Sequence, residues 1–389
     1  MEAWRTLCAL FWNEKFWLPE GFTWKHLENT DNGIYHPQVQ DLIWYSIPIA
    51  AVLLVLRPLF ERYIASPIAV HLGVKGKVIV QVPKNPILES EFKRNKNPSD
   101  KQLQAIVKQT DWTRRRAIVK QTDWTRRRVH RWFRLRRNLG RPSDIVKFSE
   151  NSWRFCFYLS AFVYGITILW DKPWFWEIRN CWIGYPDQHV SDDVFWYYML
   201  ELAFYWSLSA SHFVDIKRKD FWETFLHHIV TIFLISMSWS GNYVRIGTLM
   251  LAVHNAADVW LDAAKMAKYA GRQKLCDFLF VGFALVWLIT RLIIFPTRII
   301  HTFLFESTVI MGWYPSMQVF IAAVVVLQLL HFYWSYLISR VIYNSLALGK
   351  VEKDERSESE EQSSEEPDVL GGAGDVIDDH INHNMNEKK

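Results

Sequence analysis

Apolar residues along this chain gather into long runs that are separated by short polar connections. A helix needs about 20 predominantly apolar residues to cross the hydrocarbon core of a bilayer. The pattern predicts seven transmembrane helices, at residues 42–60, 153–170, 194–213, 225–240, 246–264, 278–295 and 318–341. The fourth is short and the fifth is polar for a span, so both need shelter from neighbouring helices. We therefore predict an all-α integral membrane protein.

Basic residues indicate how these helices cross the membrane, because Lys and Arg are retained on the cytosolic side. They are frequent in residues 61–150, 214–224 and 265–277. In a chain of seven spans, all three segments fall on the side of the C-terminus. We therefore expect a multi-pass protein with a lumenal N-terminus and a cytosolic C-terminus.

Composition divides the chain into five segments. They are a lumenal N-terminal segment (1–41), the first transmembrane helix (42–60), a cytosolic basic segment (61–150), a domain of six helices (151–345) and an acidic tail (346–389). The tail has no aromatic residue and is rich in Ser, Glu and Asp, so we expect it to be disordered. Its serines before acidic residues suit an acidophilic kinase, although such a tail can also serve solubility alone. Residues 105–116 recur unchanged at 117–128, a repeat too short for a solenoid.

Ionisable residues in the fourth and fifth predicted helices are the main candidates for chemistry. Each costs roughly 2.5 kcal/mol or more at membrane depth, so its retention calls for pairing, water contact or function. They are His227 and His228 in the fourth helix, and His254, Asp258, Asp262 and Lys265 in the fifth, where the polar Asn255 accompanies them. A spacing of four puts His254, Asp258 and Asp262 on one helix face. Asp262 and Lys265 lie near the helix end, where they can also reach the interface without any function.

The spacing of the histidines favours acid–base chemistry over metal binding. Membrane di-iron enzymes use several boxes of the HxxxH or HxxHH kind, and the comparable pair here, His380 and His383, lies in the tail. We therefore expect no metal. An imidazole takes a proton from an attacking amine or alcohol near neutral pH, or accepts an acyl group itself. A carboxylate such as Asp258 would orient one ring and stabilise its cation.

The residues from His227 to Ala270 carry a longer pattern: HH-x-x-T-x-x-L-x-x-x-S, then N-Y-x-R-x-G-T-L-x-x-x-x-H-x-x-x-D, then AKM-x-x-Y. This pattern resembles the longevity-assurance motif of ceramide synthases in the TLC superfamily. WLPEGFTW at 17–24, KFSENSWRF at 147–155 and DERSESEE at 354–361 are also similar to that family. The resemblance implies an endoplasmic reticulum membrane protein whose last six helices form a TLC-type barrel around an acyl tunnel, with 151–345 as the catalytic domain.

The resemblance also implies an activity. A fatty acyl group would pass from acyl-CoA, the co-substrate, to the amine of a sphingoid base, without a cofactor. The family pattern assigns catalysis to His227, His228 and Asp258. We expect His227 to be acylated while His228 and Asp258 handle the proton, and the opposite order of the two histidines stays open. The residues expected to support them are His254, Asn255, Asp262 and Arg245.

Asn255 departs from the family, which usually has Asp at this position. Asn keeps the shape and the hydrogen bonding of Asp but loses its charge. This change favours the alternative that the chain is a non-catalytic lipid sensor or transporter of the TLC superfamily. A homodimer or heterodimer is among the expected assemblies.

Two further segments resemble parts of the same family. The lumenal connection 296–317 corresponds to the segment linked there to acyl-chain length, and its candidate residues are Ile299, His301, Phe303, Phe305 and Trp313. TDWTRRRVHRWFRLRRNLGRP, within about 90–143, resembles the third helix of a homeodomain. A DNA reader needs Asn at the position of Leu135. We therefore expect this basic segment to contact membrane lipid headgroups or the phosphates of CoA rather than DNA.

Overall fold

The structure is a computed structural model that describes residues 12–29, 33–76, 82–96, 98–99, 102, 105–106, 126–139, 142–216 and 219–348. Within these ranges the regular structure is helical, with no strand. The prediction of an all-α protein is therefore confirmed. Most of the repeat at 105–128, and the predicted tail from residue 349 on, lie outside the described residues.

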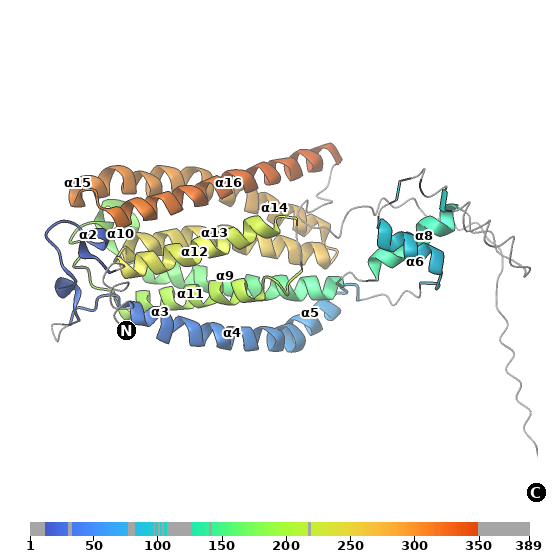
Figure 1. The fold of residues 1–389 in the computed structure, drawn as a ribbon, viewed down its shortest axis with the longest axis horizontal. Coiled ribbons are helices and arrows are strands. Elements are labelled where there is room, and N and C mark those ends of the chain that lie inside the picture. The colour runs from blue at the N-terminus through green and yellow to red at the C-terminus, as the bar shows by residue number, and fades with distance from the viewer. Residues whose placement is uncertain are drawn as a thin grey trace, which may run out of the picture.

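Long helical segments run side by side along the molecule (Figure 1). They are α3–α4–η2–α5 (Val39–Trp44, Ser46–Phe60, Glu61–Ala65, Ser66–His71), α9 (Asp144–Leu169), α11 (Asp192–Ser211), α12 (Phe221–Ser240), α13 (Val244–Tyr269), α14–η4–η5–α15 (Gln273–Trp287, Leu288–Ile300, Thr302–Glu306, Ser307–Met311) and α16 (Pro315–Leu348). Shorter elements are α2 (Glu14–Trp17), η1 (Trp24–Leu27), α6 (Pro86–Arg94), α8 (Arg126–Asn138), α10 (Pro173–Trp176) and η3 (Ile178–Cys181).

Five of the long segments are long and apolar enough to cross a membrane. They are Val39–His71, Asp144–Leu169, Phe221–Ser240, Gln273–Met311 and Pro315–Asn344. The other two, α11 and α13, have 20 and 26 residues but are less apolar, and both pack among the five. The chain is thus a multi-pass membrane protein, and a total of seven spans stays a prediction.

Two helices extend well beyond the predicted ends. The first continues from residue 60 through a π-helical stretch to His71, so helix occupies the start of the predicted cytosolic segment. The sixth continues past residue 295 through η4 and η5 to Met311, and Gly312–Tyr314 alone join it to α16. Pro296 lies inside η4, where the π-helical stretch accommodates a residue that usually ends a helix. The hydrophobic pattern could not predict these helix ends, because it shows where apolar residues stop and not where the helical backbone stops.

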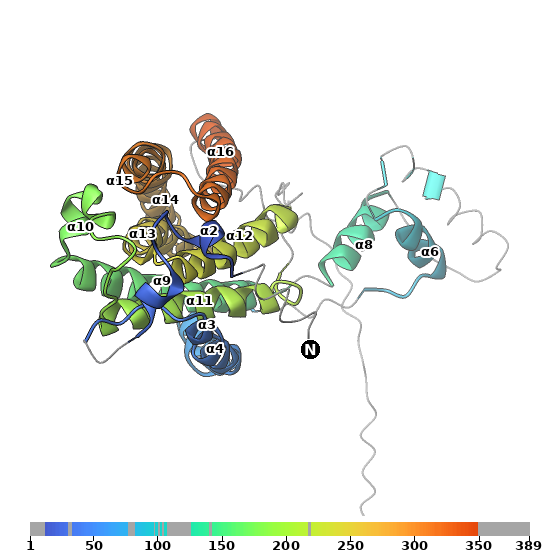
Figure 2. The ribbon, with the colours of Figure 1, turned by 60° about the vertical axis from the view of Figure 1, so that its left-hand side comes forward.

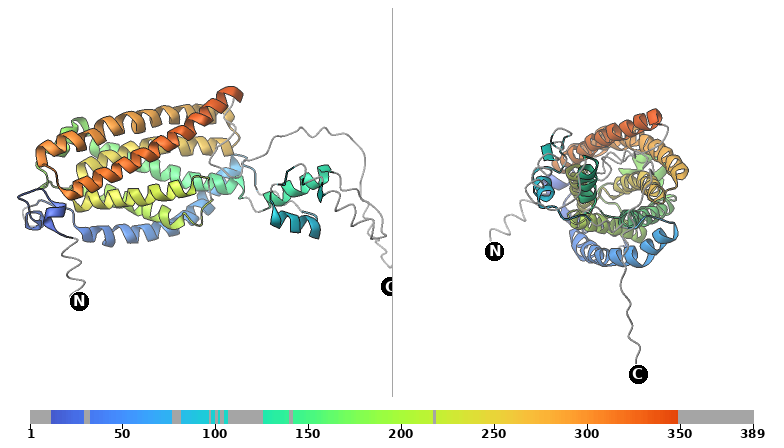
Figure 3. Two further views of the ribbon diagram at one scale, coloured as in Figure 1. Left: turned by 45° about the horizontal axis from the view of Figure 1, so that its top comes forward. Right: turned by 90° about the vertical axis from the view of Figure 1, so that its right-hand side faces the viewer.

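Six of the helical segments close into a ring. In order around the ring, α9 packs on α13, α13 on α14 and η4, η4 on α16, α16 on α12, α12 on α11, and α11 again on α9. The first segment lies outside, with α4 against α11. Figure 2 and the end-on view at the right of Figure 3 show α4 beside the ring. This arrangement agrees with the expected barrel of the last six helices.

One end of the ring, here called the cap end, is covered by residues 12–29, α10, η3 and the turn between α12 and α13 (Figure 1). The Trp182 indole donates to Thr302 Oγ1 at 2.7 Å, and the Ser316 hydroxyl donates to the Trp17 carbonyl at 3.1 Å. The Tyr185 ring stacks on Tyr243 at 5.4 Å between centroids. The opposite end, where α5, α11 and α13 finish and α9, α12 and α14 begin, is called the mouth end.

In the basic segment, the described helices α6 and α8 form a small unit. Its core contains Leu88, Phe92, Trp132 and Phe133. The Arg136 guanidinium hydrogen-bonds the Glu89 carboxylate, which holds the pKa of Glu89 below its usual range. This ion pair joins the two helices across the unit.

Candidate functional site

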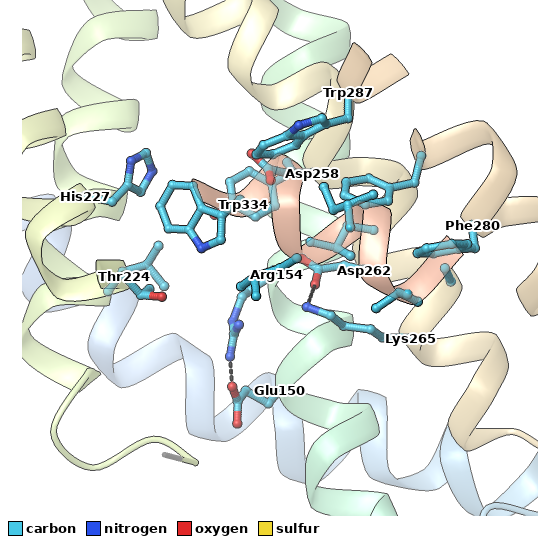
Figure 4. A pocket seen from close by; sticks show the side chains of 18 of the residues that line it. Glu150, Arg154, Thr224, His227, Asp258, Asp262, Lys265, Phe280, Trp287 and Trp334 are labelled. Carbon is cyan, nitrogen blue, oxygen red and sulfur yellow. Dashed lines mark ion pairs between the residues drawn. The ribbon is translucent and has the colours of Figure 1, made fainter. Parts of the chain in front are cut away.

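A cavity of about 220 Å³ lies inside the ring and reaches the mouth end. All six helical segments of the ring contribute side chains to it. Those drawn in Figure 4 include Glu150, Arg154, Thr224, His227, Asp258, Asp262, Lys265, Phe280, Trp287 and Trp334. Its wall is therefore apolar and aromatic with a limited set of charged groups, as small-molecule sites usually are.

The adjacent histidines of α12 both line this cavity. Their ring centroids are 5.8 Å apart, and Tyr205 of α11 packs against His227 at 6.2 Å and His228 at 6.0 Å. The edge of the Trp334 indole contacts His227 at 5.4 Å. The Nδ1 atoms of both histidines are buried and have no hydrogen-bond partner among the described residues. Aromatic packing, rather than hydrogen bonding, thus holds the two rings.

Asp258 reaches the same cavity from α13, with its side chain 24 % exposed. Figure 4 places its carboxylate beside Trp287, across the cavity from His227. The Arg291 guanidinium lies 3.4 Å from Asp258 Oδ2. The structure therefore brings all three predicted catalytic residues to one cavity and adds an arginine to the carboxylate.

Arg291 is a residue that we did not select from the sequence. It lies in η4, is 3 % exposed, donates from Nη2 to the His254 carbonyl at 2.7 Å and stands over the Trp287 ring at 5.2 Å. Its Nε and Nη1 are buried without a hydrogen-bond partner in the described chain. An arginine within an otherwise apolar run was the available signal, because a charge at membrane depth usually has a partner or a function.

Asn255 does not line the cavity. Its side-chain amide donates to the Glu201 carboxylate of α11, and both residues are almost fully buried. An uncharged donor satisfies that buried carboxylate directly, whereas Asp at this position would face it with a second acceptor. Asn255 therefore has a defined hydrogen-bond partner in this chain.

The other supporting residues fall in three different places. Asp262 lines the cavity and is 3.7 Å from Lys265. His254 lies one layer deeper, with its Nε2 3.3 Å from that of His331, which lines the cavity. Arg245 is at the cap end, where it donates to the carbonyls of Asn180 and Ile183. The structure thus does not bring Arg245 to the other site residues.

The candidate chain-length residues lie at the cap end, and none of them lines the cavity. Ile299 and Phe303 are buried in the cluster that includes Tyr243 and Trp182, whereas His301, Phe305 and Trp313 are exposed. Among the residues that the structure describes, no group of three or more His, Cys, Asp or Glu is placed to hold a metal ion.

Comparison with known proteins identifies relatives along most of the chain. Residues 147–340 match the TLC domain family. Ceramide synthase 5 of Homo sapiens is 47 % identical over 93 % of this chain and 89 % of its own length. Ceramide synthase 4 of Homo sapiens is 42 % identical over 92 % and 87 %, and ceramide synthase 3 of Homo sapiens is 38 % identical over 90 % and 88 %. Because these matches extend over nearly the whole chain at such identities, the chain belongs to the ceramide synthase family, with a TLC domain at its centre.

Proposed function

We propose that this chain is a ceramide synthase, which transfers a fatty acyl group from acyl-CoA to the amine of a sphingoid base. The observation that carries the proposal is that His227, His228 and Asp258 all line one cavity within a ring of helices. Imidazole and carboxylate are the groups that acyl transfer to an amine needs, and the helices around them limit the access of water.

In the reaction, the amine nitrogen forms a bond to the thioester carbon and the carbon–sulfur bond breaks. The amine proton ends on the sulfur of CoA, so the products are an amide and a thiol. The transfer is direct or passes through an acyl-imidazole, in which one histidine takes the acyl group first. We assign the role of nucleophile to His227 and the proton transfer to His228, with Asp258 stabilising the cation that forms. In the alternative assignment, the two histidines have each other's role.

Arg291 contributes charge to this site in two ways. It pairs with Asp258 and so compensates the negative charge of this partly buried carboxylate. Its positive charge would also stabilise the negative charge that develops on the thioester carbonyl oxygen, because Arg291 lines the cavity. The guanidinium is held for this role by the His254 carbonyl and the Trp287 ring.

The two substrates would reach the cavity by different routes. The acyl-CoA headgroup would lie at the mouth end, where Lys265 and Lys268 line the opening and can approach its phosphates. The mouth end would then face the cytosol and the cap end the lumen of the endoplasmic reticulum. The lipid amine would enter sideways from the membrane.

The test is ceramide formation by the full chain, expressed in cells that lack their own ceramide synthases. Wild type should make ceramide from sphinganine and a long-chain acyl-CoA. His227→Ala and His228→Ala should each lose activity by about 100-fold or more, as expected when a general base or nucleophile is removed. His71→Ala removes an exposed histidine at the end of α5 and serves as the control for substitution alone.

Two results would contradict the proposal. Wild type that binds acyl-CoA without forming product would indicate the alternative function, a sensor or transporter. Full activity of both histidine variants, at matched amounts of folded protein, would remove the proposed chemistry.

A further inference from the structure

A second hollow, of about 30 Å³, lies inside the ring on the cap side of the cavity. Thr231, which lines it, lies one helical turn beyond the two histidines on α12. Tyr205, which packs on both histidines, lines it as well. His254, on its wall, is 3.3 Å from His331 on the wall of the first cavity. The two spaces therefore follow one another along the inside of the ring.

The deep hollow is lined mainly by aliphatic and aromatic side chains, among them Leu234, Met250, Phe320 and Leu327. A hydrocarbon chain is the ligand that such a wall favours, because each buried methylene contributes about 0.8 kcal/mol. The chemistry of the hollow thus matches the acyl tail of the proposed substrate.

Tyr198 is at the far end of this hollow and is held rigidly. It is fully buried, and its hydroxyl lies 3.0 Å from Ser238 Oγ and donates to the Val244 carbonyl at 3.2 Å. Gly247 lies directly against it, since a Cβ at this position would be 1.6 Å from the Tyr198 hydroxyl oxygen. Three helices, α11, α12 and α13, therefore fix the position of the tyrosine ring.

We propose that Tyr198, locked by Ser238 and Gly247, is the floor of the acyl tunnel and limits the length of the chain that the enzyme transfers. This inference rests on the proposed function. With 1.5 Å of rise per residue, Ser238 lies about 16 Å beyond His227 along α12, which sets the scale of the tunnel. This floor lies inside the helix ring.

The helical residues after Pro296, which were predicted as a connection, reach this wall through a second layer. Phe303 packs against Phe320 at 4.9 Å, and Phe320 lines the deep hollow. Residues of this connection therefore touch the wall from behind, whereas Tyr198 faces the hollow directly.

The experiment is a competition between saturated acyl-CoAs that differ by two carbons, with the ceramides measured by mass spectrometry. Tyr198→Ala deepens the tunnel, and its product distribution should move to longer chains. If the deeper tunnel accepts one or two more methylenes, the ratio of kcat/KM for the longer acyl-CoA to kcat/KM for the shorter one should rise at least about tenfold. Leu234→Phe fills the hollow and should move the distribution to shorter chains.

The matched control is Tyr197→Ala, which deletes the same side chain one residue earlier on α11. Tyr197 packs against Gly165 of α9 and does not line the hollow, so the product distribution should stay that of wild type. Active Tyr198→Ala with the wild-type distribution would overturn the inference while leaving the proposed function intact. Should that variant fail to fold, an unchanged distribution in Leu234→Phe would overturn it equally. Wild type without ceramide formation would instead refute the proposed function.

Discussion

At the level of single residues, Asn255 and Glu201 form a buried pair of one amide and one acid. The amide of Asn255 donates to the carboxylate, so no proton has to be shared between them. Neither side chain lines the cavity, and their contact joins α13 to α11.

Asn255→Asp should destabilise the protein near neutral pH, by about 1–3 kcal/mol, because a buried carboxylate loses its donor and gains a second acid. Glu201→Gln in the same chain should restore stability, since the new amide can donate to the carboxylate introduced on α13. Thermal unfolding in detergent, followed for the single and double variants, measures this. A single variant as stable as wild type would show that the hydrogen bond contributes nothing.

Arg291→Gln should lower kcat by about 100-fold, the usual loss when one donor to a developing oxyanion is removed. The dissociation constant for acyl-CoA should change much less, because most of that affinity comes from the tail and the headgroup. Arg291→Lys should recover part of the rate, since it keeps the charge but not the planar set of donors.

A second arginine variant is needed to separate the loss of stability in the Arg291 variants from the loss of activity. Arg245→Gln removes a guanidinium that also stands over a tryptophan, Trp174, at 4.9 Å and bonds backbone carbonyls. The fall in melting temperature of Arg245→Gln measures how much stability is lost when a guanidinium over a tryptophan ring is removed. If kcat of Arg291→Gln equals that of wild type at matched folded protein, the guanidinium has no part in the chemistry.

At the scale of helices, α13 is the central element, because it contacts α9, α14 and η4 along its length and also touches α11 and α12. Close packing against α14 depends on a small residue at one crossing. A Cβ on Gly282 of α14 would lie 2.5 Å from the Trp260 ring of α13. The ring has no flexible end that could move aside at this point.

Gly282→Ala should therefore reduce stability by about 1–3 kcal/mol through overpacking, even though alanine favours a helix more than glycine does. Melting temperature and the yield of monodisperse protein measure the effect. Val281→Leu adds bulk to the adjacent exposed position and should change stability little. If the melting temperature of Gly282→Ala equals that of wild type, α13 and α14 can move apart at this crossing without loss of stability.

Sequence reasoning at this scale located the helices better than their ends. Each predicted apolar run corresponds to a helix. In a bilayer, an α-helix satisfies the backbone hydrogen bonds of such a run within the run itself. The ends at His71 and Met311 were missed because polar residues such as Glu61 and Arg62 interrupt apolarity without interrupting the helix. The relation of the connection 296–317 to chain length stays a prediction.

At the scale of the whole molecule, the two ends of the ring differ in chemistry. The cap end is closed by tyrosine and tryptophan side chains, and its hydroxyls bond one another, as from Tyr243 to Tyr314 at 2.7 Å. The mouth end opens into the cavity between Lys265 and Lys268 and the acids Glu150 and Asp262. A charged headgroup therefore suits one end, and an apolar tail suits the other.

This polarity predicts the orientation in the membrane. In sealed microsomes, added protease should remove a tag placed after residue 389, because the C-terminus would be cytosolic, and should leave a tag before residue 1 intact. Immunoblotting with and without detergent measures both. A protected C-terminal tag would reverse the orientation and place the mouth end, with its proposed acyl-CoA site, in the lumen.

Local sequence features were enough to predict a helical membrane protein and to select His227, His228 and Asp258 as candidates for chemistry. These conclusions depend on local order: the length of apolar runs, the spacing along one helix and a motif of adjacent residues. They hold for any arrangement of the helices.

Tertiary structure alone decided which helices are neighbours, and with them the partners of the buried groups. Arg291 meets Asp258, Asn255 meets Glu201, and Tyr198 meets Gly247, in each case from different helices. Hydrophobic periodicity predicts which residues of a helix are buried. It does not predict which residue of another helix each of them contacts. That choice follows from the packing of the ring, because only close packing brings such distant positions into contact.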